Sequence, residues 1–303
     1  MFSHRYSIRL ALIATLLVLA VSPVAAKHFG DWSAAQPLES LPGSSSEVNT
    51  AFNDGCPIQA PDGLSLYMAT NRPGGLGMID IWVAHRSSTD VGFGAPVNLG
   101  APVNSEAEDF CPTPVRGKGL FFVSRRAGGC APNSADIYFA RNNPAKGWTT
   151  PVHLGCTLNS TGDEFSPAYV EENGSGVLYF SSNRGGNHDI YRSVRQADGS
   201  FAAPIAVAGL NTASDEFRPN VRKDGREIVF DSNRPGGLGA TDIYAATRSS
   251  VDQTWSAPAN LGPAINSTAG ESRASLSWDG RTLLFGSGKA GGEGMADIYY
   301  STR

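Results

Sequence analysis

The stretch SNRPGGLGATDIY, from Ser232 to Tyr244, decides the fold because it recurs five times with variations. Its closing DIW or DIY tripeptide begins at residues 80, 136, 189, 242 and 297. Glycine and proline in its centre supply tight-turn conformations, and the flanking residues alternate as they do in strands. Each copy is therefore predicted to form a β-hairpin.

The hairpin belongs to a longer repeat. An asparagine followed by Ser or Thr starts each unit, at residues 49, 104, 159, 211 and 266, with spacings of 55, 55, 52 and 55. An acidic segment, the hairpin, and an aromatic residue with an aliphatic residue six positions later then follow in order. Each unit is thus expected to hold four short strands, and four-stranded units repeated radially form a propeller. The predicted fold class is all-β, a five-bladed β-propeller with four antiparallel strands per blade.

The fifth unit lacks its fourth strand, because the chain ends soon after the last DIY. The segment WSAAQPL (Trp32 to Leu38) matches the fourth-strand segment WSAPANL (Trp255 to Leu261). We therefore expect residues 31–48 to complete the last blade and close the ring, which removes an exposed sheet edge. Proline in the fourth strands places them at the outer edge of each blade. The predicted propeller domain spans 27–303, with repeats at 49–103, 104–158, 159–210, 211–265 and 266–303.

Residues 1–26 have the features of a secretory signal peptide. Arg5 and Arg9 precede the apolar run Leu10 to Val21, and small residues follow up to Ala26. This pattern predicts export and cleavage rather than stable membrane insertion. We expect a periplasmic or secreted protein.

The charge narrows the class of partner. The formal net charge is −4, and removal of Arg5 and Arg9 makes it −6. An acidic chain of this kind is a poor match for nucleic acid. No cofactor or metal motif is found, and FGSGKAGG (Phe285 to Gly292) lacks the Ser or Thr that follows the lysine of a phosphate-binding loop.

Four cysteines in an exported chain allow two disulfides in three connectivities. Cys56 and Cys111 hold the same repeat position in adjacent units, whereas Cys130 lies in the second hairpin turn and Cys156 follows that blade. We favour Cys56–Cys111 with Cys130–Cys156, and a Cys56–Cys130 link stays open.

The acidic segment supplies the first candidate ligand-binding residues. One acid occupies the same position in every unit: Asp54, Asp109, Glu164, Glu216 and Glu271. If the first strand of each blade lines the central channel, these acids would ring its mouth, with Arg218 and Arg273 neutralising part of that rim. The alternative is that each carboxylate accepts hydrogen bonds from backbone N–H groups of its own turn.

The hairpins suggest structural ion pairs rather than a catalytic site. In each unit a cation after the second strand would face an aspartate at the start of the third. The expected pairs are Arg72/Asp80, Arg126/Asp136, Arg184/Asp189, Arg234/Asp242 and Lys289/Asp297. Five equivalent copies argue against a single catalytic constellation.

Departures from the repeat are a second source of candidates. The third hairpin turn is shorter and carries His188, a candidate ligand-binding residue. No nucleophile motif such as GxSxG appears, so no catalytic residue is assigned.

The assembled consensus, N-[ST]-x-x-[DE]-[DE]-F-x-P followed by SNR-PGG-x-G-x-x-DIY, resembles the WD40-like repeat of TolB-type periplasmic β-propellers. The resemblance covers about residues 30 to 303. It implies a propeller fold, an envelope location, and protein or cell-wall partners. Neither a TolB-type N-terminal domain nor an appended OmpA-like domain is recognised, so peptidoglycan binding and Tol-system membership do not carry over.

Three functions remain open from the sequence. The first is an exported, monomeric, non-enzymatic module that binds an envelope protein or a glycan ligand. The second is a lectin-like propeller with several carbohydrate pockets. The third is a glycoside hydrolase or lyase, for which acid pairs such as Asp163/Glu216 would be tested.

Overall fold

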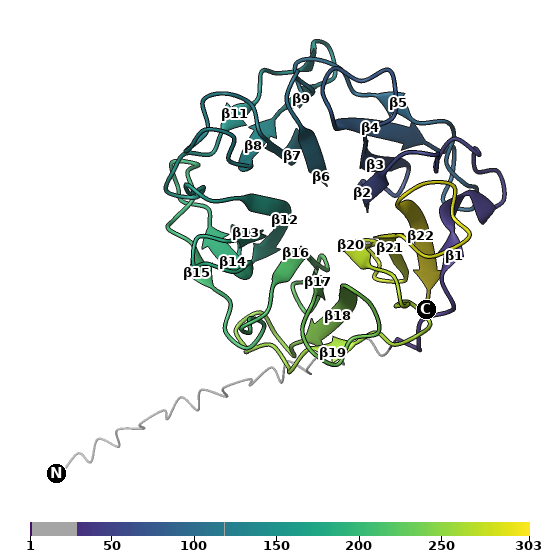
Figure 1. Cartoon of the computed structure of the whole chain (residues 1–303). Helices are drawn as coiled ribbons and strands as arrows, with labels where there is room; N and C mark the ends of the chain where they lie inside the picture. Colours follow the sequence, from purple (N-terminus) through teal and green to yellow (C-terminus); the bar gives the residue numbers. More distant parts are fainter. Residues whose placement is uncertain (2–28, 118) are drawn as a thin grey trace.

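The computed structural model describes Met1, residues 29–117 and residues 119–303, and the predicted signal peptide lies outside this part apart from Met1. Five four-stranded antiparallel sheets are arranged around a central axis, with the first strand of each blade innermost (Figure 1). The predicted five-bladed, all-β propeller is confirmed.

The blades follow the repeat. Blade one contains β2 (Asp54–Gln59), β3 (Ser65–Thr70), β4 (Asp80–His85) and β5 (Val97–Asn98). Blade two contains β6 (Asp109–Val115), β7 (Gly119–Ser124), β8 (Asp136–Ala140) and β11 (Val152–His153), with an extra hairpin of β9 (Asn142–Asn143) and β10 (Gly147–Trp148). Blade three contains β12 (Glu164–Glu172), β13 (Ser175–Ser182), β14 (Asp189–Val194) and β15 (Ile205–Ala206). Blade four contains β16 (Glu216–Val221), β17 (Glu227–Ser232), β18 (Asp242–Thr247) and β19 (Ala259–Asn260).

Blade five is assembled from both ends of the described chain. β20 (Glu271–Leu276), β21 (Thr282–Ser287) and β22 (Asp297–Thr302) come from the last repeat, and β1 (Gln36–Pro37) is the fourth strand. β1 pairs antiparallel with β22, and a short 3-10 helix, η1 (Leu38–Ser40), follows it. The predicted ring closure is confirmed.

The repeated asparagine explains how one blade is attached to the next. Asn104 accepts a hydrogen bond from Ile81 N at 2.9 Å and donates one to Ile81 O at 2.9 Å, so it clamps the third strand of the preceding blade. Asn49 makes the same pair of bonds with Ile298 and thereby joins blade one to blade five. A buried amide that satisfies a backbone N–H and C=O at once is favourable, which accounts for its recurrence in all five units.

The apolar core lies between neighbouring blades. One cluster packs Val177 and Tyr179 of blade three against Ile228 and Phe230 of blade four, and comparable clusters occupy the other blade interfaces. Each first strand therefore shows its remaining face to the central channel. Within the described residues, no helix has the length and apolar character needed to cross a membrane.

Candidate functional site

The five repeated acids do not form an open rim. All five are fully buried: Asp54, Asp109, Glu164, Glu216 and Glu271. In each blade the backbone N–H four residues earlier donates to the carboxylate, as Thr212 N does to Glu216 at 2.6 Å. The expectation of a ligand-accessible acidic ring is wrong, and the alternative, in which each acid serves its own turn, is confirmed. The physical reason is that a buried carboxylate needs hydrogen-bond donors, and this turn supplies them.

The four hairpin arginines bind these acids and not the predicted aspartates. The observed ion pairs are Arg72–Asp54 and Arg126–Asp109 at 2.6 Å, and Arg184–Glu164 and Arg234–Glu216 at 3.0 Å. In the fifth blade, the Lys289 ammonium lies 3.8 Å from the ring centroid of Tyr299. The predicted pairings Arg72/Asp80, Arg126/Asp136, Arg184/Asp189, Arg234/Asp242 and Lys289/Asp297 are therefore corrected.

The third-strand aspartates have a different role. Leu238 N donates to Asp242 Oδ2 at 2.6 Å, and the turns of blades one, two and five supply equivalent donors. Asp189 Oδ1 and Asp136 Oδ1 are both buried without a hydrogen-bond partner. Burial chiefly, with the charges of Glu216 and Asp215, raises the pKa of Asp189. The aspartates of blades one, two, four and five hold their hairpin turns.

A constriction, here called the neck, lies where each first strand bulges. The bulge residues have positive φ angles of 48° to 59°, and they are Cys56, Cys111, Ser166, Arg218 and Arg273. These five residues line a cavity of about 30 Å³ on the channel axis. Because they hold equivalent places in five blades, the residue type at this position sets the chemistry of the neck.

The disulfides match the predicted connectivity. Cys56 and Cys111 are joined across blades one and two, and Cys130 is joined to Cys156. The first disulfide therefore closes one side of the neck, and the second ties a hairpin turn to the start of the link into blade three.

Arg218 and Arg273 occupy the other side of the neck with Asp231 behind them. Arg218 Nη1 lies 2.6 Å from Asp231 Oδ2, and Arg273 N donates to Asp231 Oδ1 at 3.0 Å. Asp231 is fully buried, and Arg273 Nε is buried without a hydrogen-bond partner. Burial, followed by repulsion from Arg218, lowers the pKa of Arg273 to about 10. The sequence singled out both arginines but missed Asp231, which lies inside a strand.

A larger cavity opens at the other end of the first strands, next to their turns into the second strands. This turn-side cavity has a volume of about 510 Å³. Tyr169 and Trp278 provide aromatic surface, and the polar or charged lining residues are Gln59, Thr113, Arg116, Glu171, Asn220 and Lys223. Sequence reasoning missed it because these residues come from five different repeats and none is a repeat landmark.

His188 lies away from both cavities, in an aromatic stack. Its ring is 5.0 Å from that of Phe165, nearly parallel, and 4.7 Å from that of Phe217. Nδ1 is buried without a hydrogen-bond partner, and burial lowers the pKa of His188. The ring does not line the neck or the turn-side cavity, and the role of His188 as a ligand-binding residue stays a prediction.

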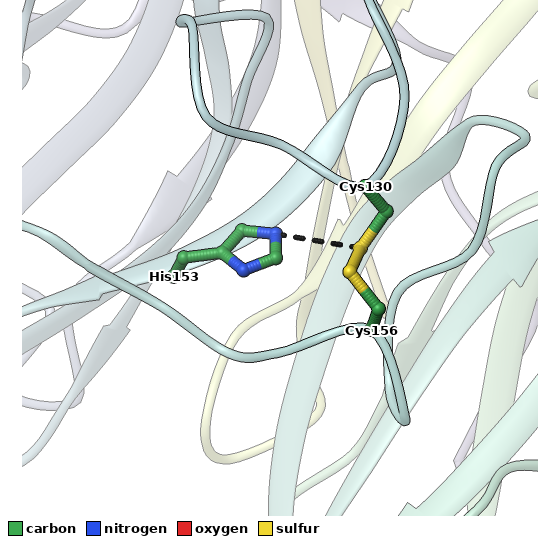
Figure 2. A group of neighbouring side chains, drawn as sticks. All are labelled: Cys130, His153 and Cys156. Carbon is green, nitrogen blue, oxygen red and sulfur yellow. Dashed lines mark hydrogen bonds between the residues drawn. A yellow bond between two sulfur atoms is a disulfide. The ribbon is translucent and has the colours of Figure 1, made fainter.

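Cys130, His153 and Cys156 are close enough to resemble a metal site (Figure 2). Their potential ligand atoms lie within 4.8 Å of one another. The two sulfur atoms, however, are bonded to each other, so neither is a free thiolate. His153 Nε2 lies 2.9 Å from Asp136 Oδ2 and takes the place that Asn98 and Asn260 hold in blades one and four. With this disulfide formed, Cys130, His153 and Cys156 stabilise the structure of blade two.

Comparison of the sequence with family models and with curated proteins finds no match. Among solved structures, the α-L-arabinofuranosidase PaAbf62A of Podospora anserina has a TM-score of 0.52 at 15% identity, covering 90% of this chain and 96% of its own. The α-L-arabinofuranosidase of Lactobacillus brevis has a TM-score of 0.54 at 14% identity, covering 83% and 90%. TolB of Acinetobacter baumannii has a TM-score of 0.51 at 16% identity, covering 82% of this chain and 54% of its own. The chain is similar to these propellers in fold, and at such identities the likeness establishes the fold alone.

Proposed function

We propose that this protein is an exported binding module that takes a saccharide in its turn-side cavity without hydrolysing it. The observation that carries the proposal is the lining of that cavity, about 510 Å³ in volume, where Trp278 and Tyr169 stand among amide and charged side chains. Ligand pockets of this size are commonly aromatic with a few polar groups that fix orientation. Aromatic rings offer a flat apolar surface to the C–H face of a sugar, and the polar groups suit its hydroxyls.

The absence of hydrolysis is proposed from the acids. Glycosidases of the common type place two carboxylates about 5–9.5 Å apart on either side of the scissile bond. Glu171 is the one acid among the described residues that line the turn-side cavity. Glu216 is fully buried and bonded to Thr212, Ser232 and Arg234, so the pair Asp163/Glu216 does not present two carboxylates to a substrate.

A glycoside hydrolase is the second candidate function, and the fold likeness to two α-L-arabinofuranosidases favours it. It predicts release of free sugar, whereas the binding proposal predicts recovery of intact ligand. The same likeness supports the saccharide class for both candidates.

The location and partner are part of the proposal. Two disulfides are compatible with an oxidising compartment, which supports a periplasmic or secreted protein. We expect the ligand to be a glycan of the cell envelope or its surroundings, and the protein to act as a monomer. An envelope protein that carries such a glycan would be the corresponding macromolecular partner.

The test uses mature protein, residues 27–303, on a panel of neutral and acidic oligosaccharides, with affinity measured by calorimetry and products by chromatography. Trp278→Ala is expected to weaken binding about tenfold or more, because an aromatic stacking surface is lost. Phe52→Ala is the matched control, since Phe52 is an exposed aromatic outside the cavity lining.

Failure to bind any oligosaccharide, or unchanged affinity in Trp278→Ala, would overturn the binding proposal. Release of monosaccharide by the wild-type protein would establish the hydrolase instead.

A further inference from the structure

The neck is chemically asymmetric, although the repeat makes its five positions equivalent. Blades one and two contribute the Cys56–Cys111 disulfide, and blade three contributes Ser166. Blades four and five contribute Arg218 and Arg273. Both guanidinium groups therefore stand on one side of a narrow cavity whose other side is neutral.

The positive charge of the neck is only partly neutralised. Asp231 contacts Arg218 through its side chain and Arg273 through the backbone N–H. The corresponding second-strand residues in the other blades carry no charge, and they are Ala69, Val123, Ser181 and Gly286. One carboxylate thus faces two guanidiniums, and Arg273 Nε keeps an unused buried donor. A buried donor without a partner is costly, so an acceptor supplied by a ligand would be favoured.

The neck adjoins the turn-side cavity. Ile58, Thr113 and Asn220 line both spaces. The neck volume of about 30 Å³ is enough for a group the size of a carboxylate, because one water needs about 10–15 Å³ of the same kind of space. The turn-side cavity adds Arg116 and Lys223 against Glu171. In a chain of net charge −4, this channel is a local concentration of cations.

We propose that the neck is an anion site, in which Arg273 and Arg218 bind the carboxylate of an acidic saccharide whose sugar rings occupy the turn-side cavity. A planar carboxylate matches the guanidinium fork and fits the narrow neck better than a tetrahedral sulfate or phosphate does. This inference rests on the proposed saccharide-binding function and names its substrate class as uronate-containing oligosaccharides.

The experiment compares trigalacturonate with its fully methyl-esterified form, using calorimetry at low ionic strength and mature protein. The two probes share ring structure and differ in charge. Wild-type protein is expected to bind trigalacturonate about tenfold or more tightly than the ester, since a charge-assisted contact is lost in the ester. Arg273→Gln is expected to abolish that difference, whereas Arg195→Gln, which removes an exposed outer arginine, retains it.

A second variant guards against misfolding. A Cβ on Gly55 would lie 2.6 Å from Arg273 Nη1, so Gly55→Ala displaces the guanidinium while every charge is kept. It too is expected to reduce the preference for the acid, and thermal melting of each variant reports whether the ring is intact.

The outcomes separate the two proposals. Equal binding of acid and ester, or an acid preference that survives both Arg273→Gln and Gly55→Ala, overturns the anion site and leaves saccharide binding in place. Binding of neutral oligosaccharides without trigalacturonate does the same. Binding of no oligosaccharide at all overturns both.

Discussion

His188 is the residue whose environment departs most from what its sequence position suggested. A turn histidine is ordinarily exposed, but this ring is stacked between Phe165 and Phe217. Burial lowers its pKa from 6.5, with Asp215 opposing that shift, Arg218 adding to it and Asp163 opposing it. The folded protein therefore holds His188 neutral at a pH where the unfolded chain protonates it.

This difference predicts a pH dependence of stability. As the pH falls below about 6.5, the unfolded state binds a proton that the folded state does not, so the free energy of unfolding decreases until the folded pKa is reached. Urea unfolding at pH 7.5 and 5.5 should show a smaller loss in His188→Gln than in wild type. His85→Gln, a change at an exposed histidine, should lose as much as wild type does. Identical losses in all three proteins would refute this account.

At the scale of the element, the repeat predicted the strands well and the side-chain partners poorly. Glu216 lies opposite Ser232 in the β16–β17 ladder, and Ser232 lies opposite Asp242 in the β17–β18 ladder. Arg234, two residues beyond Ser232, is therefore near both acids. Sequence spacing favoured Asp242 because it is closer along the chain, but turn N–H groups already occupy that carboxylate. The ion-pair partner of Arg234 therefore depends on which carboxylate the turn N–H groups bind.

Glu216 is consequently expected to stabilise the folded protein. Glu216→Gln removes the charge that Arg234 and Thr212 N require and puts an amide among donors. We expect the free energy of unfolding to fall by about 3–5 kcal/mol, as it does when a buried ion pair loses one partner. Denaturant titration measures this, with Glu293→Gln as the control at an exposed position. A loss no larger than that of the control would show that Glu216 is not part of the structural network.

The first strands also explain why only part of the channel lining was predicted from the sequence. The bulge position could be located from the repeat, so Arg218 and Arg273 were singled out together with the two cysteines. Asp231 was missed because its position is acidic in only one of the five repeats, so the repeat consensus does not mark it. The turn-side cavity was missed because its lining residues come from five different repeats and none is a repeat landmark.

At the scale of the whole molecule, ring closure rests on β1. Its backbone pairs Gln36 with Tyr300 and Pro37 with Tyr299, and Leu38 packs in the cluster shared by blades one and five. Deletion of residues 27–48 should greatly lower the melting temperature, because it exposes the edge of β22 and removes buried Leu38 and Val48. Gln36→Ala keeps the backbone pairing and should melt like wild type. A deletion variant with an unchanged melting curve would show that the fifth blade is stable with three strands.

Closure by β1 also sets an order of events in time. β1 is made before every other strand of the propeller, and its partner β22 is made after all of them. The hydrogen bonds of Asn49 likewise require Ile298, which is 249 residues later in the chain. The seam therefore forms only when synthesis has passed β22, so a nascent chain remains an open arc during translation.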